Sequence, residues 1–131
     1  MRKFKGWFIV LLISLSLFGM TACSDGGANS YEQITPQEAK TIMDTEKDYI
    51  IIDARTDEEF AEGHIADAIL IPEYEIADRA EKELPNKDAL ILVYCRSGRR
   101  SKIASEELVK LGYTNVKEFG GIFDWPYEVV K

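Results

Sequence analysis

Residues 94–103, "YCRSGRRSKI", gather basic side chains around a cysteine in a chain that is otherwise acidic. A thiolate is the reactive form of cysteine, and it is stabilised by nearby Arg or Lys side chains and by a helix N-terminus. The small residues Ser97 and Gly98 let the backbone curl so that successive N–H groups can face an anion. The stretch therefore predicts a nucleophile in an anion-binding loop, made of Cys95 and the cations Arg96, Arg99, Arg100 and Lys102. A tight loop cannot aim every cation inward, so some must face solvent or acidic neighbours.

The competing interpretation of Cys95 is a small core residue, because a cysteine that follows a buried strand is often packed and inert. A core cysteine has no use for three arginines and a glycine-containing turn in the next five residues. We therefore favour the reactive thiol.

The flanking sequence predicts strands that alternate with helices. Apolar, β-branched runs predict strands at 49–54, 68–71, 89–94 and 115–119. Capping boxes and apolar spacing predict helices that begin after Thr35 and Thr56, span 73–84, and carry Ala104, Leu108 and Leu111, with a last turn at Trp125. This alternation predicts an α/β fold with a mainly parallel central sheet and helices on both faces. Ligands in such folds bind beyond the carboxyl ends of the strands, where Cys95 is expected.

Composition limits the chain to one small domain and excludes some partners. It has 131 residues, 46% of them apolar, with 16 basic and 23 acidic residues. Without the basic residues of the extreme N-terminus, 13 basic residues face 23 acidic ones, a net charge of −10. Such a surface repels nucleic acid, so we expect no nucleic-acid partner. We also expect the protein to be a monomer.

The first 22 residues are typical of a secretory signal. A basic start leads into an apolar run at 6–20, which is short for a spanning helix of about 18–20 residues. The sequence "MTAC" (20–23) resembles the lipobox of bacterial lipoproteins, with Met20 where Leu is usual. That resemblance implies a lipid on Cys23 and a place on the outer side of a bacterial membrane. An ordinary cleaved signal and an uncleaved anchor are the alternatives.

The expected organisation is a signal peptide at 1–22, a flexible tether at 23–30 and a folded domain at 31–131. The domain then touches the membrane only through its N-terminal lipid. With Cys23 acylated, Cys95 is the only thiol in an oxidising compartment and has no disulfide partner within the chain.

Three motifs in order resemble one known family. "CRSGRRS" (95–101) looks like the active loop of single-domain rhodaneses, a family of sulfurtransferases. "IIDARTDEEFAEGHIADAILIP" (51–72) is similar to that family's N-terminal signature, and "GGIFDW" (120–125) to its closing motif; the likeness extends over 31–128. Ala66 and Asp67 stand where the family usually has Pro-Gly, so we expect a changed turn without loss of chemistry.

The resemblance implies sulfur transfer through a persulfide on Cys95. The thiolate attacks the outer sulfur of a small anionic donor such as thiosulfate, sulfite leaves, and cyanide or a thiol acceptor removes the sulfur. Loop N–H groups around Ser97 and Gly98 hold the terminal sulfur, while Arg96, Arg99 or Arg100 orient the donor oxygens. No cofactor or metal is expected. Four residues are assigned supporting roles: Asp53, Arg55, His64 and Ser101.

Three other functions stay open. Phosphatases and arsenate reductases with a related fold place an arginine six residues after the cysteine, where this chain has Ser101, with Arg100 one place earlier. A sulfur carrier or anion-binding module for a partner protein would use the same loop without turnover. A redox sensor would oxidise Cys95 to the sulfenic acid.

Other polar and aromatic residues have simpler interpretations. His64, the only histidine, is expected to support a turn rather than to act on substrate. Asp53 and Arg55 are expected to brace neighbouring loops, unless they form a simple surface pair. The acidic residues at 57–59 and 62 are interpreted as a solvated helix start, and Phe123 and Trp125 as core.

Overall fold

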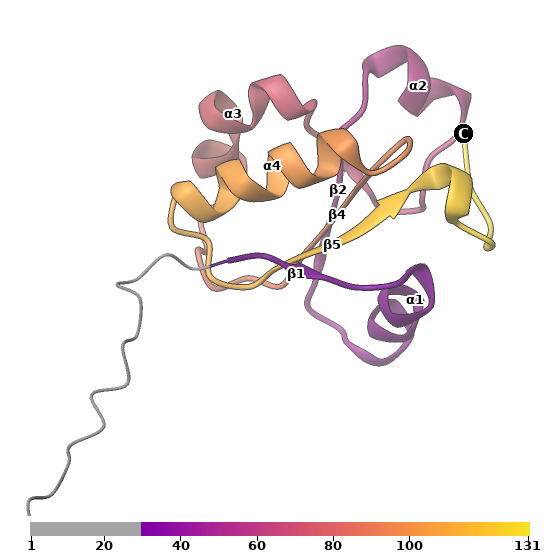
Figure 1. Cartoon of the computed structure of the whole chain (residues 1–131), viewed down its shortest axis with the longest axis horizontal. Coiled ribbons are helices and arrows are strands. Elements are labelled where there is room, and N and C mark those ends of the chain that lie inside the picture. The colour runs from indigo at the N-terminus through magenta and orange to yellow at the C-terminus, as the bar shows by residue number, and fades with distance from the viewer. Residues whose placement is uncertain (1–29) are drawn as a thin grey trace, which may run out of the picture.

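The computed structural model describes residues 30–131, which form a five-stranded parallel sheet between two layers of helices (Figure 1). The strand order is β1-β5-β4-β2-β3, so β4 lies at the centre. The strands are β1 (Glu32–Gln33), β2 (Ile50–Asp53), β3 (Ile69–Leu70), β4 (Ile91–Cys95) and β5 (Val116–Gly121). This is the α/β fold that the sequence predicts.

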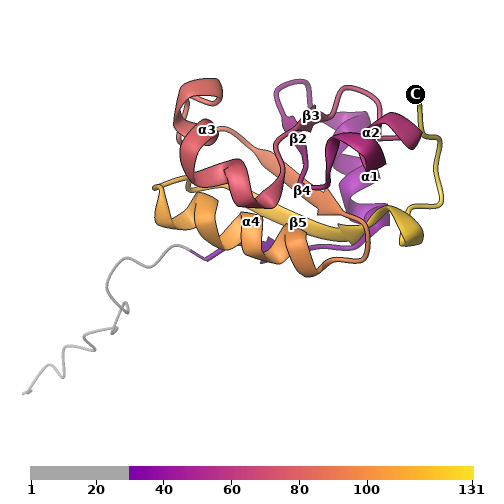
Figure 2. The ribbon, with the colours of Figure 1, turned by 90° about the horizontal axis from the view of Figure 1, so that it is seen from above.

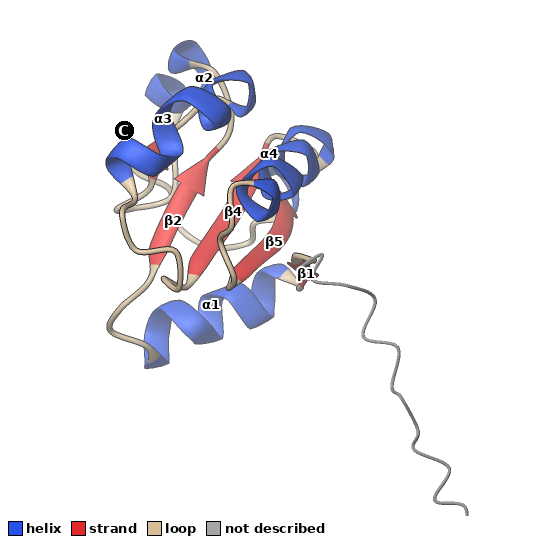
Figure 3. Ribbon diagram, turned by 90° about the vertical axis from the view of Figure 1, so that its left-hand side faces the viewer, coloured by secondary structure: helices blue, strands red, loops and turns tan. Residues whose placement is uncertain are grey.

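The helices cover both faces of the sheet. Helix α1 lies on one face, and α3 and α4 lie on the other, as Figures 1 and 3 show from two directions. The helices are α1 (Pro36–Thr45), α2 (Asp57–Glu62), α3 (Ile76–Glu83) and α4 (Arg99–Lys110), with 3-10 turns at Glu73–Glu75 and Ile122–Asp124. No helix within residues 30–131 is long and apolar enough to cross a membrane. The predicted signal peptide and Cys23 lie outside the described residues.

Both predicted capping boxes are present. The Thr35 hydroxyl accepts the Glu38 N–H at 3.1 Å, and the Glu38 carboxylate accepts the Thr35 N–H at 2.7 Å. Thr56 and Glu59 form the same pair at the start of α2. These boxes satisfy N–H groups that have no partner within the helix, so they fix where α1 and α2 begin.

The central strand β4 divides the core into two clusters. Because side chains alternate along a strand, Ile91, Val93 and Cys95 face α3 and α4, while Leu92 and Tyr94 face α1. All five residues are at most 1% exposed. Cys95, the first residue of the loop at 95–101 that we call the reactive loop, thus belongs to the side of the sheet that α4 covers.

Several element boundaries differ from the sequence-based prediction. The short strand β1 was not predicted, because its two residues are polar and exposed. Strand β5 runs on to Gly121 rather than ending at 119, and α4 begins at Arg99, inside the basic loop. The segment 73–84 divides into a 3-10 turn and α3. For β1 and β5, pairing with a neighbouring strand, rather than the apolar pattern, sets the boundary.

The turn at Ala66 and Asp67, where we expected a change from the family's usual Pro-Gly turn, is closed by one backbone hydrogen bond. Ala68 N–H donates to Ile65 O at 3.1 Å, and Asp67 is the one non-glycine residue within 30–131 with a positive φ, +66°. An i to i+3 bond with a positive φ at the third residue is the type II pattern, which a Pro-Gly pair also fits. Asp67 therefore occupies a conformation that glycine would adopt more easily.

Candidate active site

Cys95 lies at the carboxyl end of β4, immediately before the turn into α4. Its Sγ accepts a hydrogen bond from the Gly98 N–H at 3.0 Å, and Gly98, with φ +108°, caps the N-terminus of the twelve-residue helix α4. The side chain is 1% exposed, so Sγ faces the inside of its own loop. An N–H donor and a helix N-terminus both favour negative charge on the sulfur.

The end of β5 supports this loop from the other side. Cys95 pairs with Gly121 in the sheet, and Phe123 N–H donates to Arg96 O at 3.3 Å. A Cβ on Gly121 would lie 2.0 Å from Arg96 O and 2.5 Å from Ser97 N. The backbone of the closing Gly-Gly motif therefore touches the backbone of the reactive loop, which only a residue without a side chain permits.

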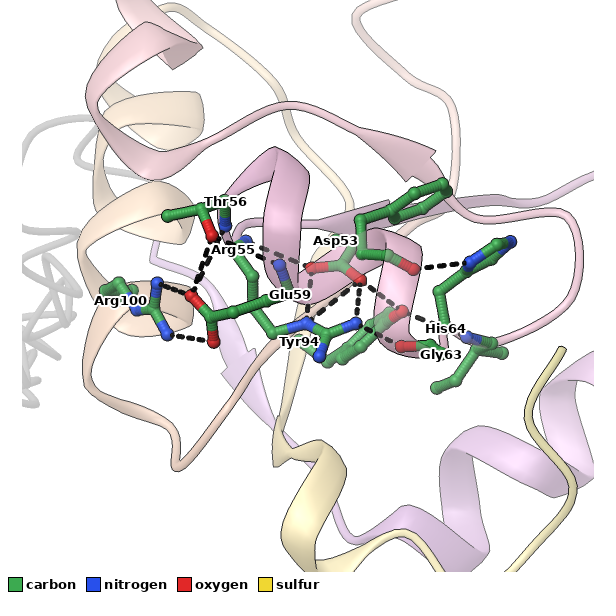
Figure 4. Close-up of polar contacts among 10 residues, drawn as sticks. Asp53, Arg55, Thr56, Glu59, Gly63, His64, Tyr94 and Arg100 are labelled. Carbon is green, nitrogen blue, oxygen red and sulfur yellow. Dashed lines mark hydrogen bonds and ion pairs between the residues drawn. The ribbon is translucent and has the colours of Figure 1, made fainter. Parts of the chain in front are cut away.

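The loop arginines divide between solvent and an acidic neighbour. Arg96 and Arg99 are exposed, and the Arg96 guanidinium lies over the Phe123 ring, 4.9 Å from its centroid. Arg100 instead makes a two-pronged ion pair with Glu59 of α2, at 2.7 and 2.9 Å (Figure 4). Hydrogen bonding to Glu59 raises the pKa of Arg100, and the charge of Cys95 adds to the effect. Arg100 thus links α2 to the reactive loop.

Glu59 was missed by the sequence analysis. Its hydrogen bonds from Arg100 lower its pKa to about 2. The interpretation of this acidic run as a solvated helix start holds for the exposed residues Asp57, Glu58 and Glu62 and is wrong for Glu59. The capping box in the sequence explains its bond to Thr56, but no local pattern points to a partner 41 residues away.

Asp53 and Arg55 form a buried ion pair beneath the loops, 0% and 5% exposed. Arg55 Nη2 donates to Asp53 Oδ2 at 2.7 Å and to Gly63 O at 2.7 Å (Figure 4). The Tyr94 hydroxyl donates to the same carboxylate at 2.6 Å and accepts the Ile65 N–H at 3.0 Å. The pair therefore braces the segment after α2, and the simple surface pair is excluded. Burial and the neighbouring Asp53 charge raise the pKa of Tyr94.

His64 has only structural contacts in this arrangement. Its ring stacks on Phe60 with centroids 3.7 Å apart, and Nδ1 lies 3.0 Å from Phe60 O. Its backbone forms an antiparallel bridge with Val130 near the C-terminus. Figure 2 shows α2 and the C-terminus at the same end of the molecule.

Ser101 brings a second overlooked residue to the thiol. Its Oγ lies 3.4 Å from Cys95 Sγ and donates to Glu118 Oε1 at 2.6 Å. Glu118, on β5, is 3% exposed. The alternation of β5 places it on the same side as buried Val116, which is the one sequence signal that would have marked it.

A cleft of about 610 Å³ opens beside the loop. One wall carries Arg55, Glu59 and Arg96, and another is aromatic. In that second wall Trp125 is buried, as predicted, whereas Phe123 is 67% exposed, so its prediction as a core residue is wrong. Within residues 30–131 no group of three or more metal-ligating side chains comes together.

A parallel α/β sheet with a thiol at the end of its central strand, facing a helix N-terminus, defines a class of nucleophilic cysteine domains. Within that class, the model of the Rhodanese-like domain matches residues 35–127. The chain belongs to the rhodanese-like family.

Known sulfurtransferases are among its relatives. The chain is 39% identical over 80 residues to thiosulfate sulfurtransferase PspE of Escherichia coli, covering 61% of this chain and 77% of that protein. It is 34% identical over 104 residues to the adenylyltransferase and sulfurtransferase UBA4 of Candida albicans, covering 74% of this chain and only 24% of UBA4. A solved structure described as a rhodanese with anions from E. coli is 37% identical, with a TM-score of 0.60, covering 63% of this chain and 98% of that one.

Proposed function

We propose that this protein is a sulfurtransferase that moves a sulfane sulfur from thiosulfate, or a similar anionic donor, to cyanide or a thiol. The observation that carries the proposal is the position of Cys95 Sγ, bound by the Gly98 N–H at the N-terminus of α4. The Cys95 thiolate attacks the outer sulfur, the S–S bond of thiosulfate breaks with its electron pair on sulfite, and a persulfide remains on Cys95. Cyanide then takes the terminal sulfur as thiocyanate, and the thiolate returns.

The cations left free by the fold suit the donor oxygens. Arg100 is paired with Glu59, so Arg96 and Arg99 are the loop arginines with guanidinium groups open to a sulfonate. Arg96 is held over Phe123 at the edge of the cleft. The anions named in the description of the E. coli relative support an anion site in this family.

The same contacts disfavour phosphatase or arsenate-reductase chemistry. A transferred phosphoryl group needs an arginine that grips its oxygens in the transition state. Arg100, the arginine nearest to that role in the sequence, already binds a carboxylate through two hydrogen bonds. A carrier that delivers its persulfide to one protein partner uses the same loop, and it is distinguished by slow release to cyanide and fast release to that partner.

Mass spectrometry tests the reaction class directly. Treating the protein with thiosulfate should add one sulfur atom to the Cys95 peptide, and cyanide should remove it. Cys95→Ser should fold normally, gain no sulfur and lose sulfur transfer. Substantial turnover in Cys95→Ser, or faster hydrolysis of phosphate esters than sulfur transfer, would contradict the proposal.

We also propose that the domain acts as a monomer and is tethered to the extracytoplasmic side of a bacterial membrane by a lipid on Cys23. The support is the signal-like sequence at 1–22 and the cysteine that follows it. Labelling with a fatty-acid analogue should mark the full-length protein and leave Cys23→Ser unlabelled.

A further inference from the structure

Glu118 is a buried carboxylate that the proposed reaction does not use. Its Oε1 accepts hydrogen bonds from Ser101 Oγ at 2.6 Å and from Gly120 N–H at 2.8 Å, and Gln33 Nε2 reaches Oε2 at 3.4 Å. None of the ion pairs among residues 30–131 includes Glu118. Burying a carboxylate without a cation is unfavourable, so its position under the reactive loop calls for an explanation.

Glu118 connects to the nucleophile through one hydroxyl. The Cys95 thiol donates to Ser101 Oγ at 3.4 Å, and the Ser101 hydroxyl donates to Glu118 Oε1. A hydroxyl can accept one proton while it donates another. The chain of three groups therefore has two arrangements: a thiol with a carboxylate, or a thiolate with a carboxylic acid.

We infer that Glu118 receives the proton of the Cys95 thiol through Ser101 and so supplies the thiolate within the folded protein. The Sγ–H bond breaks as an Oγ–H bond forms, and the original Ser101 proton moves to Oε1. The total charge stays the same. This inference rests on the proposed function, in which Cys95 attacks as a thiolate. Glu118 acts through Ser101 and never touches the donor, so it is a positioning residue.

This proton relay, from Cys95 through Ser101 to Glu118, ends away from the cleft of about 610 Å³ beside Arg96. Glu118 lines a different cleft of about 340 Å³ together with Lys102 and Asp124. The charge of Glu118 also acts on Tyr31: burial raises the pKa of Tyr31, and the charges of Glu106 and Glu118 add to that shift. On the thiol side, the charge of Cys95 acts on Arg100, which is already paired with Glu59. The relay thus ends on the side of the loop away from Arg96 and the donor.

The rate at which iodoacetamide alkylates Cys95, measured against pH without any sulfur donor, tests the relay. Two groups that share one proton titrate in two coupled steps. Between the pH values of those two steps the fraction of thiolate stays constant, so the wild-type alkylation rate should be nearly independent of pH there. Glu118→Gln keeps a hydrogen-bond acceptor but cannot take the proton. Its rate should fall about tenfold for each pH unit below its midpoint, as for one independent thiol. Glu106→Gln, which removes an exposed carboxylate nearby, should keep the wild-type profile.

Ser101→Ala provides a second test, because it cuts the relay and leaves Glu118 in place. It should also show the single-step profile, and near-ultraviolet circular dichroism of each variant checks the fold. If the alkylation rate of the wild-type protein shows a single titration step, the relay is contradicted by that measurement alone. A two-step profile that persists in Glu118→Gln would also contradict it. Sulfur gain on Cys95 after thiosulfate tests the proposed function separately, so either idea can fail while the other holds.

Discussion

At the scale of single residues, Asp67 is the position where the sequence departs from the easiest backbone conformation. Its φ of +66° lies in the left-handed region, which costs a non-glycine residue about 1 kcal/mol or more. Asp67→Gly should therefore raise the free energy of unfolding by about 0.5–1 kcal/mol, measured by urea denaturation.

The neighbouring residue Ala66 provides the control for this prediction. Ala66 has no positive φ, so Ala66→Gly only increases the entropy of the unfolded chain and should lower stability. Equal effects of the two glycine substitutions would show that the turn conformation of Asp67 carries no strain.

Residue chemistry also decides how much of the site was visible in the sequence. Cys95 and its arginines stand out because cations beside a thiol have a local chemical meaning. The alternation of β5 could have marked Glu118 as buried, but its contact with Ser101 spans 17 residues and that of Glu59 with Arg100 spans 41, so no local pattern reveals either partner. Phe123 is predicted in the core because its side chain is apolar, yet its exposed ring lies under the guanidinium of Arg96.

At the scale of elements, the end of β5 and the reactive loop form one unit. A methyl group on Gly121 would lie 2.0 Å from Arg96 O, so Gly121→Ala must displace the loop or the strand. A shift of about 1 Å at a nucleophile can lower activity about 100-fold, and we expect a loss in kcat/KM for thiosulfate of that order.

Gly112 offers a matched comparison with Gly121. It has a φ of +97°, and a Cβ there would meet no atom within 4 Å. Gly112→Ala should therefore destabilise the fold by about 1 kcal/mol through backbone strain and leave kcat/KM nearly unchanged. If both variants lost activity equally, close packing of β5 against the loop would not be the cause.

The ion pair between α2 and α4 predicts a pH dependence of stability. Bonding to Arg100 lowers the pKa of Glu59 from 4.5 to about 2 in the folded protein. A carboxyl with a lowered folded-state pKa stabilises the protein above its unfolded value and loses that contribution as the pH falls. The stability supplied by Glu59 should therefore disappear between about pH 4.5 and pH 2.

Urea denaturation at several pH values measures this effect. Over that acid range, Glu59→Gln should lose less stability than the wild type, because it has no carboxylate to protonate. Glu58→Gln, one residue earlier and exposed, should follow the wild-type curve. Parallel curves for wild type and Glu59→Gln would mean that the pair with Arg100 does not form in solution.

The same scale shows why the fold was easier to predict than its edges. Buried strands such as β4 and capped helices such as α1 have strong patterns of their own, and both were predicted. Strand β1 exists only because Glu32 and Gln33 pair with β5, and β5 extends to Gly121 because Cys95 pairs there. Pairing between distant segments sets these boundaries, so a pattern along one segment cannot reveal them.

At the scale of the whole molecule, the C-terminal tail closes the end that carries α2. His64 and Val130 exchange two backbone hydrogen bonds of 2.8 Å, and Val129 packs 3.6 Å from the place where a Gly63 Cβ would be. Gly63 O is in turn the acceptor for Arg55, which braces the segment after α2. The tail therefore reaches the active site through α2, which holds Arg100 by way of Glu59.

Deleting residues 129–131 tests this long-range connection. The two backbone hydrogen bonds together have a net contribution of about 1–3 kcal/mol, and the entropy lost in ordering the tail offsets part of it. The deletion should therefore lower the free energy of unfolding by about 1–2 kcal/mol. Because α2 loses support, kcat/KM for thiosulfate should fall several-fold, less than in Gly121→Ala, where the loop itself moves. Deleting Lys131 alone removes neither bond and should change neither quantity. A truncated protein with full activity and lower stability would show that the tail stabilises the fold without positioning the reactive loop.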